Sequence, residues 1–339
     1  MAIQTLGLDI GKSTFHAVGV DAQGQVIHRH KYTRAALMRF MANLPPCLVG
    51  MESCPGSHHL ARRFLEHGHT VKLMAAQFVK PYVKSNKSDF LDAEAIVEAV
   101  TRPSMRFVPV KTPAQQDLQA IHRVRSGLVT QRTATINQLR AFLLENGLTI
   151  PRGISALKLR VPAILEDAEN GLSPRMRALA AELWRQILDL KARAEALTGE
   201  LTRLAEGDEA CRRLLTVPGV GPLTATALVA AIGNGSEFRR GRELAAFLGL
   251  VPRQYSTGGK PTLLGISKRG NNYLRMLFIH GARSVLQTAD KRTDRLGPWL
   301  RGLKVRRHAN VAAVALANKL ARVAWAVLVH GNDYQPSAA

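Results

Sequence analysis

Short apolar runs of strand length alternate with amphipathic stretches of helix length over the first hundred residues. The apolar runs predict strands at residues 3–9, 14–20, 25–30, 47–51 and 70–74. Helices are expected at residues 35–44, 58–67 and 88–100, after the third, fourth and fifth strands. Adjacent strands followed by strands separated by helices indicate a meander that continues into parallel crossovers. This part of the chain therefore predicts an α/β domain.

The pattern changes to long helices after a segment rich in proline. Residues 101–113 contain three prolines and are expected to be a linker. A long helix is predicted at residues 114–145, ended by Asn146-Gly147, and residues 150–171 are expected to be irregular. Ser173 then caps a second long helix, which has Pro174 at its first position.

The second long helix carries an apolar seam with steps that alternate between four and three residues. The seam consists of Leu183, Ile187, Leu190, Ala194, Leu197, Leu201 and Leu204. A seam of this period predicts a coiled coil, within the chain or between chains. Gly199 within the helix weakens this prediction, and an ordinary amphipathic helix on a core explains the same positions equally well.

The net charge of the chain limits the classes of binding partner that it can have. The 339 residues include 47 Lys and Arg against 25 Asp and Glu, a formal net charge of +22. Residues 238–339 contain 18 Lys and Arg against 4 Asp and Glu. An excess of this size favours a polyanionic partner, and nucleic acid ranks above an anionic membrane. The three cysteines are odd in number and lack metal-binding spacing, and no signal-peptide pattern opens the chain, so a cytoplasmic protein is predicted. The apolar residues 311–329 are expected to form a buried helix.

Four carboxylates are the candidate catalytic residues. Asp9 and Glu52 end two apolar strands, where an unpaired buried carboxylate is costly. Asp89 and Asp92 lie three residues apart on an expected helix, so they project from one face. Converging carboxylates repel one another unless cations lie between them, and phosphoryl-transfer nucleases use two Mg²⁺ or Mn²⁺ ions about 3.5–4 Å apart. Taken together, the four residues predict such a metal site, although singly each has a simpler role as a helix-terminus or surface acid. The surrounding α/β order is of the ribonuclease-H-like kind.

Three further segments are candidates for contact with nucleic acid. Residues 215–224 contain a Pro-Gly-Val-Gly turn between two helices, the pattern of a helix-hairpin-helix, in which Gly219 and Gly221 would present backbone N–H groups to a phosphate. Residues 249–260 form a glycine-rich loop in which Ser256 is flanked by Arg253 and Lys260. Ser256 could attack phosphorus, although composition alone favours a plain loop serine. The other basic candidates are Lys12, Lys268, Arg269 and Arg275. The histidines at positions 58, 59, 67 and 69 lack a metal-binding frame and are expected in the core or on the surface.

These motifs occur together in one order along the chain. They are Leu-Gly-Leu-Asp9-Ile-Gly-Lys, Val-Gly-Met-Glu52-Ser, Lys87-Ser-Asp89-Phe-Leu-Asp92-Ala, the Pro-Gly-Val-Gly turn and Pro-Arg-Gln-Tyr-Ser256-Thr-Gly-Gly-Lys. The combination resembles the DEDD-type insertion-sequence transposases related to the Piv DNA invertase, the bridge-RNA-guided recombinases. Members of that family usually have Ser-Ser-Gly in the serine loop, whereas this chain has Ser256-Thr257-Gly258. Thr257 therefore also offers a hydroxyl.

The resemblance implies a fold, a site and a set of partners. It implies a RuvC-like catalytic domain at residues 1–105, a helical coiled-coil linker at 106–208, and a mainly α transposase domain with a helix-hairpin-helix at 209–335. Asp9, Glu52, Asp89 and Asp92 would bind Mg²⁺ or Mn²⁺, and Ser256 would form a covalent phosphoserine. The implied partners are donor and target double-stranded DNA, a structured guide RNA, and further copies of the chain in a dimer or tetramer, in the bacterial nucleoid.

Three alternatives share some of these features. A Holliday-junction nuclease would use the same metal chemistry with water as the nucleophile. A sugar-kinase or actin-like ATPase would use residues 9–14 as a phosphate loop, but a second Asp-x-Gly loop is not evident after residue 100. A non-catalytic nucleic-acid-binding protein would need only the hairpin and the basic residues.

Overall fold

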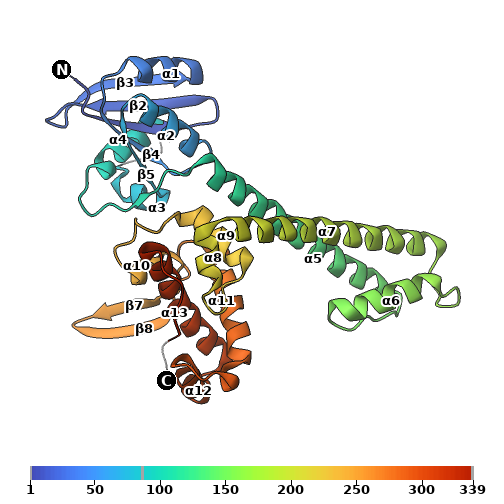
Figure 1. Ribbon diagram of the computed structural model, residues 1–339. Coiled ribbons are helices and arrows are strands. Elements are labelled where there is room, and N and C mark those ends of the chain that lie inside the picture. Colours follow the sequence, from blue (N-terminus) through green and yellow to red (C-terminus); the bar gives the residue numbers. More distant parts are fainter. Residues whose placement is uncertain (1, 85–87, 337–339) are drawn as a thin grey trace. The chain divides into compact units, whose positions relative to one another are not determined.

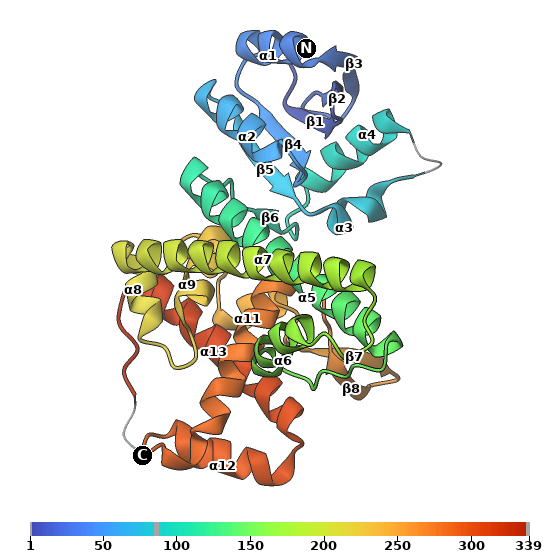
Figure 2. The same ribbon diagram turned by 90° about the vertical axis from the view of Figure 1, so that its right-hand side faces the viewer.

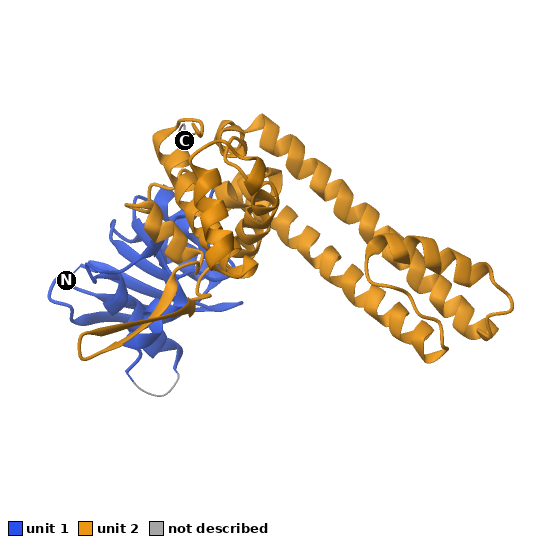
Figure 3. Ribbon diagram, turned by 90° about the horizontal axis from the view of Figure 1, so that it is seen from below, with its two compact units in different colours: residues 1–113 blue, residues 114–339 orange. Residues whose placement is uncertain are grey.

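The computed structural model describes residues 2–84 and 88–336, and the chain forms two compact units, residues 1–113 and 114–339 (Figure 3). The motif residue Lys87 lies outside the described residues. The division into three domains at 1–105, 106–208 and 209–335 stays a prediction.

Unit 1 is built on a six-stranded mixed sheet with helices on both faces (Figure 1). Its strands are β1 (Thr5–Ile10), β2 (Thr14–Val20), β3 (Val26–Thr33), β4 (Leu48–Glu52), β5 (Thr70–Met74) and β6 (Phe107–Val108). Its helices are α1 (Arg34–Asn43), α2 (Ser57–Glu66), α3 (Ala76–Val79), the 3-10 helix η1 (Lys80–Tyr82) and α4 (Asp89–Val100). The sheet order is β3-β2-β1-β4-β5-β6, with β1, β4 and β5 parallel to one another. The expected α/β domain is confirmed, and its sheet is compatible with the ribonuclease-H-like fold. The expected linker at 101–113 contains a strand, because β6 pairs with β5.

Alternate strand residues pack against different helices, as the two-residue period of a strand requires. Leu6 and Leu8 of β1 lie in a buried cluster with side chains of α1 and α2. Val18 and Val20 of β2 lie on the other face, in a cluster with Ala93 and Val97 of α4. Figure 2 shows α4 and α2 on opposite sides of the sheet. Asp9 shares the α4 face, because it lies two residues after Gly7, which contacts α4.

Two glycines allow α4 to lie unusually close to the sheet. A methyl group on Gly7 would lie 2.2 Å from the carbonyl oxygen of Ala93, and one on Gly50 would lie 2.9 Å from Cβ of Val100. Gly7 and Gly50 are paired across β1 and β4, so they form one flat area on the sheet. Because only glycine leaves this space free, the two residues bring the start of α4 to the ends of β1 and β4.

Unit 2 is mainly helical. Its helices are α5 (Pro113–Glu145), α6 (Ile154–Glu166), α7 (Pro174–Gly207), α8 (Glu209–Leu215), α9 (Pro222–Ile232), α10 (Gly241–Phe247), α11 (Asn272–Gln287), the 3-10 helix η2 (Ala289–Lys291), α12 (Leu296–Arg306) and α13 (Ala309–His330). The exception is a two-stranded hairpin of β7 (Pro252–Thr257) and β8 (Lys260–Ile266). The two long helices α5 and α7 are present as expected, and Ser173 caps α7 by accepting a hydrogen bond from the backbone N–H of Met176.

The prediction of irregular structure at residues 150–171 is wrong. Helix α6 occupies most of this segment although it contains Pro162. Leu157 and Val161, one turn apart, are buried in a cluster with Leu139 of α5 and Ile187 of α7. This tertiary burial outweighs the local cost of proline, which a sequence pattern registers as a helix break.

The apolar seam of α7 is only partly buried. Ile187, Ala194 and Leu201, seven residues apart, are buried, whereas Leu204 is 41 % exposed. Ile187 packs within the chain, against the cluster shared with α5 and α6. The coiled coil therefore stays a prediction, and α7 is described as an amphipathic helix with one buried line.

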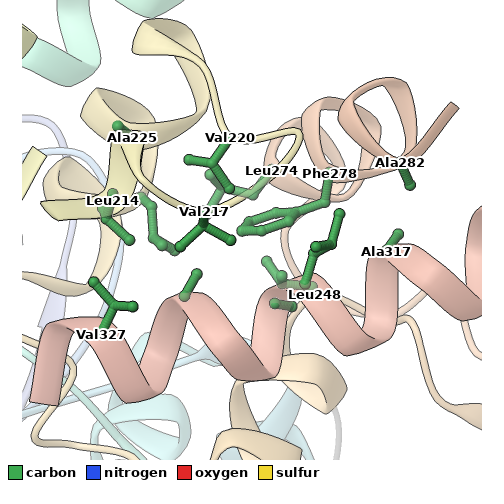
Figure 4. Close-up of a cluster of buried hydrophobic side chains, with 14 of the residues drawn as sticks. Leu214, Val217, Val220, Ala225, Leu248, Leu274, Phe278, Ala282, Ala317 and Val327 are labelled. Atoms are coloured by element: carbon green, nitrogen blue, oxygen red, sulfur yellow. The ribbon is translucent and has the colours of Figure 1, made fainter. Parts of the chain in front are cut away.

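The core of unit 2 gathers around α11 and α13. Figure 4 shows Phe278 of α11 among Val217, Leu248 and Ala317, and these side chains belong to one buried cluster. Helix α13 is long and apolar enough to cross a membrane by length and composition alone. Nine of its side chains, Leu316 among them, are buried in the structure, as expected for the helix at 311–329.

Candidate active site

The four predicted carboxylates come together at one end of the sheet of unit 1. Asp9 lies near the carboxyl end of β1, and Glu52 is the last residue of β4. Since β1 and β4 are parallel neighbours, their carboxyl ends lie at the same edge. Asp89 is the first residue of α4 and Asp92 lies in its first turn, over the same strands. The sheet, the glycine pair and the start of α4 therefore account for the convergence.

The closeness of the four carboxylates affects their pKa values. Burial raises the pKa of Asp9, and the charges of Asp92 and Asp89 raise it further. Burial also raises the pKa of Glu52, with added repulsion from Asp9 and Asp92. The cluster is half open, because the side chain of Asp9 is 27 % exposed and that of Asp89 is 59 % exposed. Ionised together, these groups are unfavourable without a cation.

A histidine that the sequence did not reveal belongs to the same place. His16 of β2 lies directly opposite Asp9 in the antiparallel register of β1 and β2. Its Nδ1 atom is 3.5 Å from Oδ2 of Asp89 and 4.0 Å from Oδ2 of Asp9. The register of the hairpin between the two strands could have indicated His16, since a tight hairpin that pairs Ile10 with Phe15 also pairs Asp9 with His16.

The residues present fit a divalent metal site. Carboxylate oxygens from four residues are the hard donors that Mg²⁺ and Mn²⁺ take. One ligand atom each from Asp9, His16 and Asp89 lies within 4.8 Å of the others. Burial first, and then mutual repulsion, raises the pKa of Asp9 and Glu52, and a bound cation would offset both effects. The other acids of α4 point elsewhere, since Glu94 pairs with Arg29 and Glu98 with Arg102.

Ser256 lies in unit 2, on β7, rather than in the expected loop. The loop prediction is wrong because Gly258 and Gly259, with φ of 54° and 75°, form the two-residue turn of a β-hairpin. Ser256 pairs with Pro261, and the side-chain amide of Gln254 donates a hydrogen bond of 2.8 Å to its Oγ atom. Ser256 is exposed on this hairpin.

The basic residues predicted to contact nucleic acid differ in their exposure. The exposed ones are Lys12 in the β1–β2 connection, Arg253 and Lys260 on the hairpin, and Lys268 and Arg269 before α11. The prediction that Arg275 contacts nucleic acid is wrong, because Arg275 is only 7 % exposed. Its guanidinium donates hydrogen bonds to the carbonyl oxygens of Leu248 and Arg269. These bonds hold the loop that carries Lys268 and Arg269, so Arg275 is not available to a phosphate.

The glycine turn connects two helices, α8 and α9, as the hairpin pattern predicts. Gly219 has φ of 77°, and a methyl group on it would lie 2.7 Å from the carbonyl oxygen of Gly281 in α11. Its glycine identity is therefore explained by turn geometry and close packing. Gly221 is the N-cap residue of α9, with open space beside its Cα atom. A role in phosphate binding stays a prediction for both residues.

The mixed sheet and its carboxylate cluster are compatible with the ribonuclease-H-like class of DNA-processing enzymes. Comparison with known families gives the family itself. A model for DEDD transposases of the IS110 type, described as "Transposase", matches residues 6–146, and the model "Transposase IS116/IS110/IS902 family" matches residues 211–296.

Individual relatives match almost the whole chain. The transposase for insertion sequence element IS1328 of Yersinia enterocolitica is 46 % identical over 98 % of both chains. A probable family 20 transposase of Pseudomonas aeruginosa is 48 % identical over 99 % of this chain and 100 % of its own. The pilin gene-inverting protein of Moraxella bovis is more distant, at 24 % identity over 79 % of this chain and 76 % of its own. The chain belongs to the IS110/IS116 family of transposases, which are DNA-recombining enzymes, and this membership removes the kinase alternative.

Proposed function

We propose that this transposase cuts and rejoins DNA with a composite site, in which the four carboxylates hold two divalent ions and Ser256 is the nucleophile. The observation that carries the proposal is the convergence of Asp9, Glu52, Asp89 and Asp92, with raised pKa values at Asp9 and Glu52. Clustered carboxylates that disfavour their own ionisation are suited to cation binding.

The chain's own groups have distinct tasks. The sheet positions the backbone of Asp9 and Glu52, and the first turn of α4 positions that of Asp89 and Asp92, before substrate arrives. Bound Mg²⁺ or Mn²⁺ would polarise the scissile phosphate and stabilise the leaving oxygen. The exposure of Asp89 leaves the cluster accessible to a DNA backbone.

Ser256 supplies the covalent step in this proposal. Its Oγ atom forms a bond to phosphorus while the bond from phosphorus to the 3′-oxygen breaks, and the serine proton passes to solvent or to the leaving oxygen. The products are a phosphoserine and a free 3′-hydroxyl, which later attacks a phosphoserine to rejoin the strands. The hydrogen bond from Gln254 occupies an acceptor position of Oγ and orients it. Ser256 and Thr257 are adjacent strand residues on opposite faces of the hairpin, so only one of them faces a given partner.

The partners follow from charge and from family. The exposed cations Lys12, Arg253, Lys260, Lys268 and Arg269 would contact phosphates of DNA, together with the Gly219–Gly221 turn. A structured RNA encoded by the element would choose sequence by base pairing. Two or four copies of the chain would combine carboxylates and serines from different protomers.

The carboxylate assignment is tested with conservative amide variants on DNA carrying the element's ends. Asp9→Asn and Asp92→Asn should abolish strand cleavage while nucleic-acid affinity stays within a few-fold, since one charge in a chain of +22 is removed. Glu94→Gln is the matched control, because Glu94 lies on the same helix but pairs with Arg29. Recombination at wild-type rates by both Asp variants would overturn the proposal.

The nucleophile is tested by trapping the adduct between protein and DNA. We expect a covalent adduct with wild-type protein and Thr257→Ala, and none with Ser256→Ala. Cleavage by Ser256→Ala without any adduct in the wild type would identify a nuclease that uses water.

A further inference from the structure

We propose that His16 is a direct ligand of the metal ion held by Asp9 and Asp89, so that this transposase has a mixed oxygen and nitrogen site that favours Mn²⁺ over Mg²⁺. This inference rests on the proposed carboxylate site and adds a residue outside the four acids.

The position of His16 is fixed by the sheet. It is the cross-strand partner of Asp9, on the sheet face that α4 covers, and its side chain is 9 % exposed. A histidine buried at this depth beside two carboxylates needs a polar partner. Its Nδ1 atom points at both, 3.5 Å from Asp89 Oδ2 and 4.0 Å from Asp9 Oδ2.

The separations suit ligands of one ion. Ligand atoms about 2.1 Å from an octahedral ion lie about 3 Å apart when adjacent and about 4.2 Å apart when opposite. The 3.5 Å and 4.0 Å separations at His16 fall within this range. They are longer than the roughly 2.9 Å of a usual N–H···O hydrogen bond, so the imidazole is set back from both acids. One ligand atom from each of the three residues lies within 4.8 Å of the others, which places all three around one candidate ion position.

Neighbouring side chains hold the imidazole ring in this direction. Phe90 of α4 meets the ring edge-on, with centroids 4.8 Å apart and an interplanar angle of 76°. The guanidinium of Arg29 lies 4.8 Å from the centroid of Phe90 and donates a hydrogen bond of 2.8 Å to Glu94. Packing of this kind pre-orients a ligand before the ion binds.

The ligand type changes metal preference. Mg²⁺ takes oxygen ligands and retains water, whereas the first-row divalent ions accept imidazole nitrogen. An imidazole at this site therefore favours Mn²⁺ relative to a site of four carboxylates alone.

The test is the electron spin-echo spectrum of Mn²⁺ bound to the full chain, which detects nitrogen coordinated to the ion. We expect nitrogen coupling in the wild type, its loss in His16→Gln, and its persistence in His28→Gln, since His28 packs against Phe40 of α1. Titration should show Mn²⁺ affinity reduced at least about tenfold in His16→Gln and Mg²⁺ affinity changed less than about threefold. His16→Asp should shift the preference towards Mg²⁺, and circular dichroism confirms that each variant is folded.

The outcomes separate the two proposals. Asp9→Asn should remove Mn²⁺ binding together with its nitrogen coupling. If Asp9→Asn binds Mn²⁺ as the wild type does, the carboxylate site itself is wrong. If Asp9→Asn removes Mn²⁺ binding but the wild-type spectrum lacks nitrogen coupling, only the role of His16 is overturned.

Discussion

The substitution Gly7→Ala tests how the fold builds the site without touching a carboxylate. The added methyl group would lie 2.2 Å from the carbonyl oxygen of Ala93 and 2.6 Å from Cγ2 of Val97. Restoring even a 3.0 Å contact needs a displacement of about 0.8 Å, and because the obstacle is helix backbone, α4 itself must shift.

The cost follows from this overlap. Overpacking of a tight core contact destabilises by about 1–3 kcal/mol, and an alanine in place of glycine recovers roughly 0.5–1 kcal/mol through the unfolded chain. We expect a net loss of about 1–2 kcal/mol in the free energy of unfolding of unit 1. Since α4 carries Asp89 and Asp92, a shift approaching 1 Å should also lower the cleavage rate, by up to about 100-fold.

The assay must distinguish the two units. All three tryptophans, Trp184, Trp299 and Trp325, lie in unit 2, so their fluorescence in urea reports that unit. Hydrogen exchange of the unit 1 amides, those of β1 and α4 among them, reports that unit, and protection should fall in unit 1 and not in unit 2 in Gly7→Ala. Gly199→Ala is the control, because open space surrounds Gly199 in α7 and the change should be neutral or stabilising. Unchanged protection and cleavage in Gly7→Ala would refute the argument.

Three further predictions concern charge. Burial is the main cause that raises the pKa values of Asp9 and Glu52, so without metal the folded state favours their protonated forms. The resulting stability is present at low pH and is lost as the pH rises through the raised pKa values. Urea titrations in the presence of chelator should therefore show a falling free energy of unfolding of unit 1 over that pH range. Asp9→Asn should therefore stabilise the metal-free protein at neutral pH while it abolishes cleavage. A destabilised variant would contradict the claim that the ionised carboxylate of Asp9 is unfavourable in the metal-free fold. Arg275→Met leaves two carbonyls without their partner and should cost roughly 2–4 kcal/mol in urea unfolding, whereas Arg269→Met should leave stability unchanged and weaken DNA binding at every sequence, and the reverse pattern would contradict these assignments.

The sequence predicted the site best where carboxylate residues lie at the ends of predicted strands. The predicted strand at residues 3–9 ends in Asp9 and the one at 47–51 is followed directly by Glu52, and their parallel pairing brings these residues together. The α/β fold of unit 1 was predictable from the same runs. His16 was missed because its role depends on the register between two strands, which composition does not reveal.

Other features depend on tertiary contacts that no local pattern contains. Helix α6 includes Pro162 because its apolar side is buried against α5 and α7. Arg275 resembles its exposed basic neighbours in sequence, and only the packing of α11 against the loop after α10 shows it to be buried. Gly7 and Gly50 give α4 its place, and only the packing of the helix against the sheet shows this role.

The central claim is that the four carboxylates form a divalent-cation site. Calorimetric titration of the full chain with Mg²⁺ and with Mn²⁺ tests it most directly, in the wild type, Asp9→Asn, Glu52→Gln, Asp92→Asn and the control Glu94→Gln. The account predicts saturable binding in the wild type and in Glu94→Gln, and its loss in the other three variants. Wild-type binding in those three variants would contradict it.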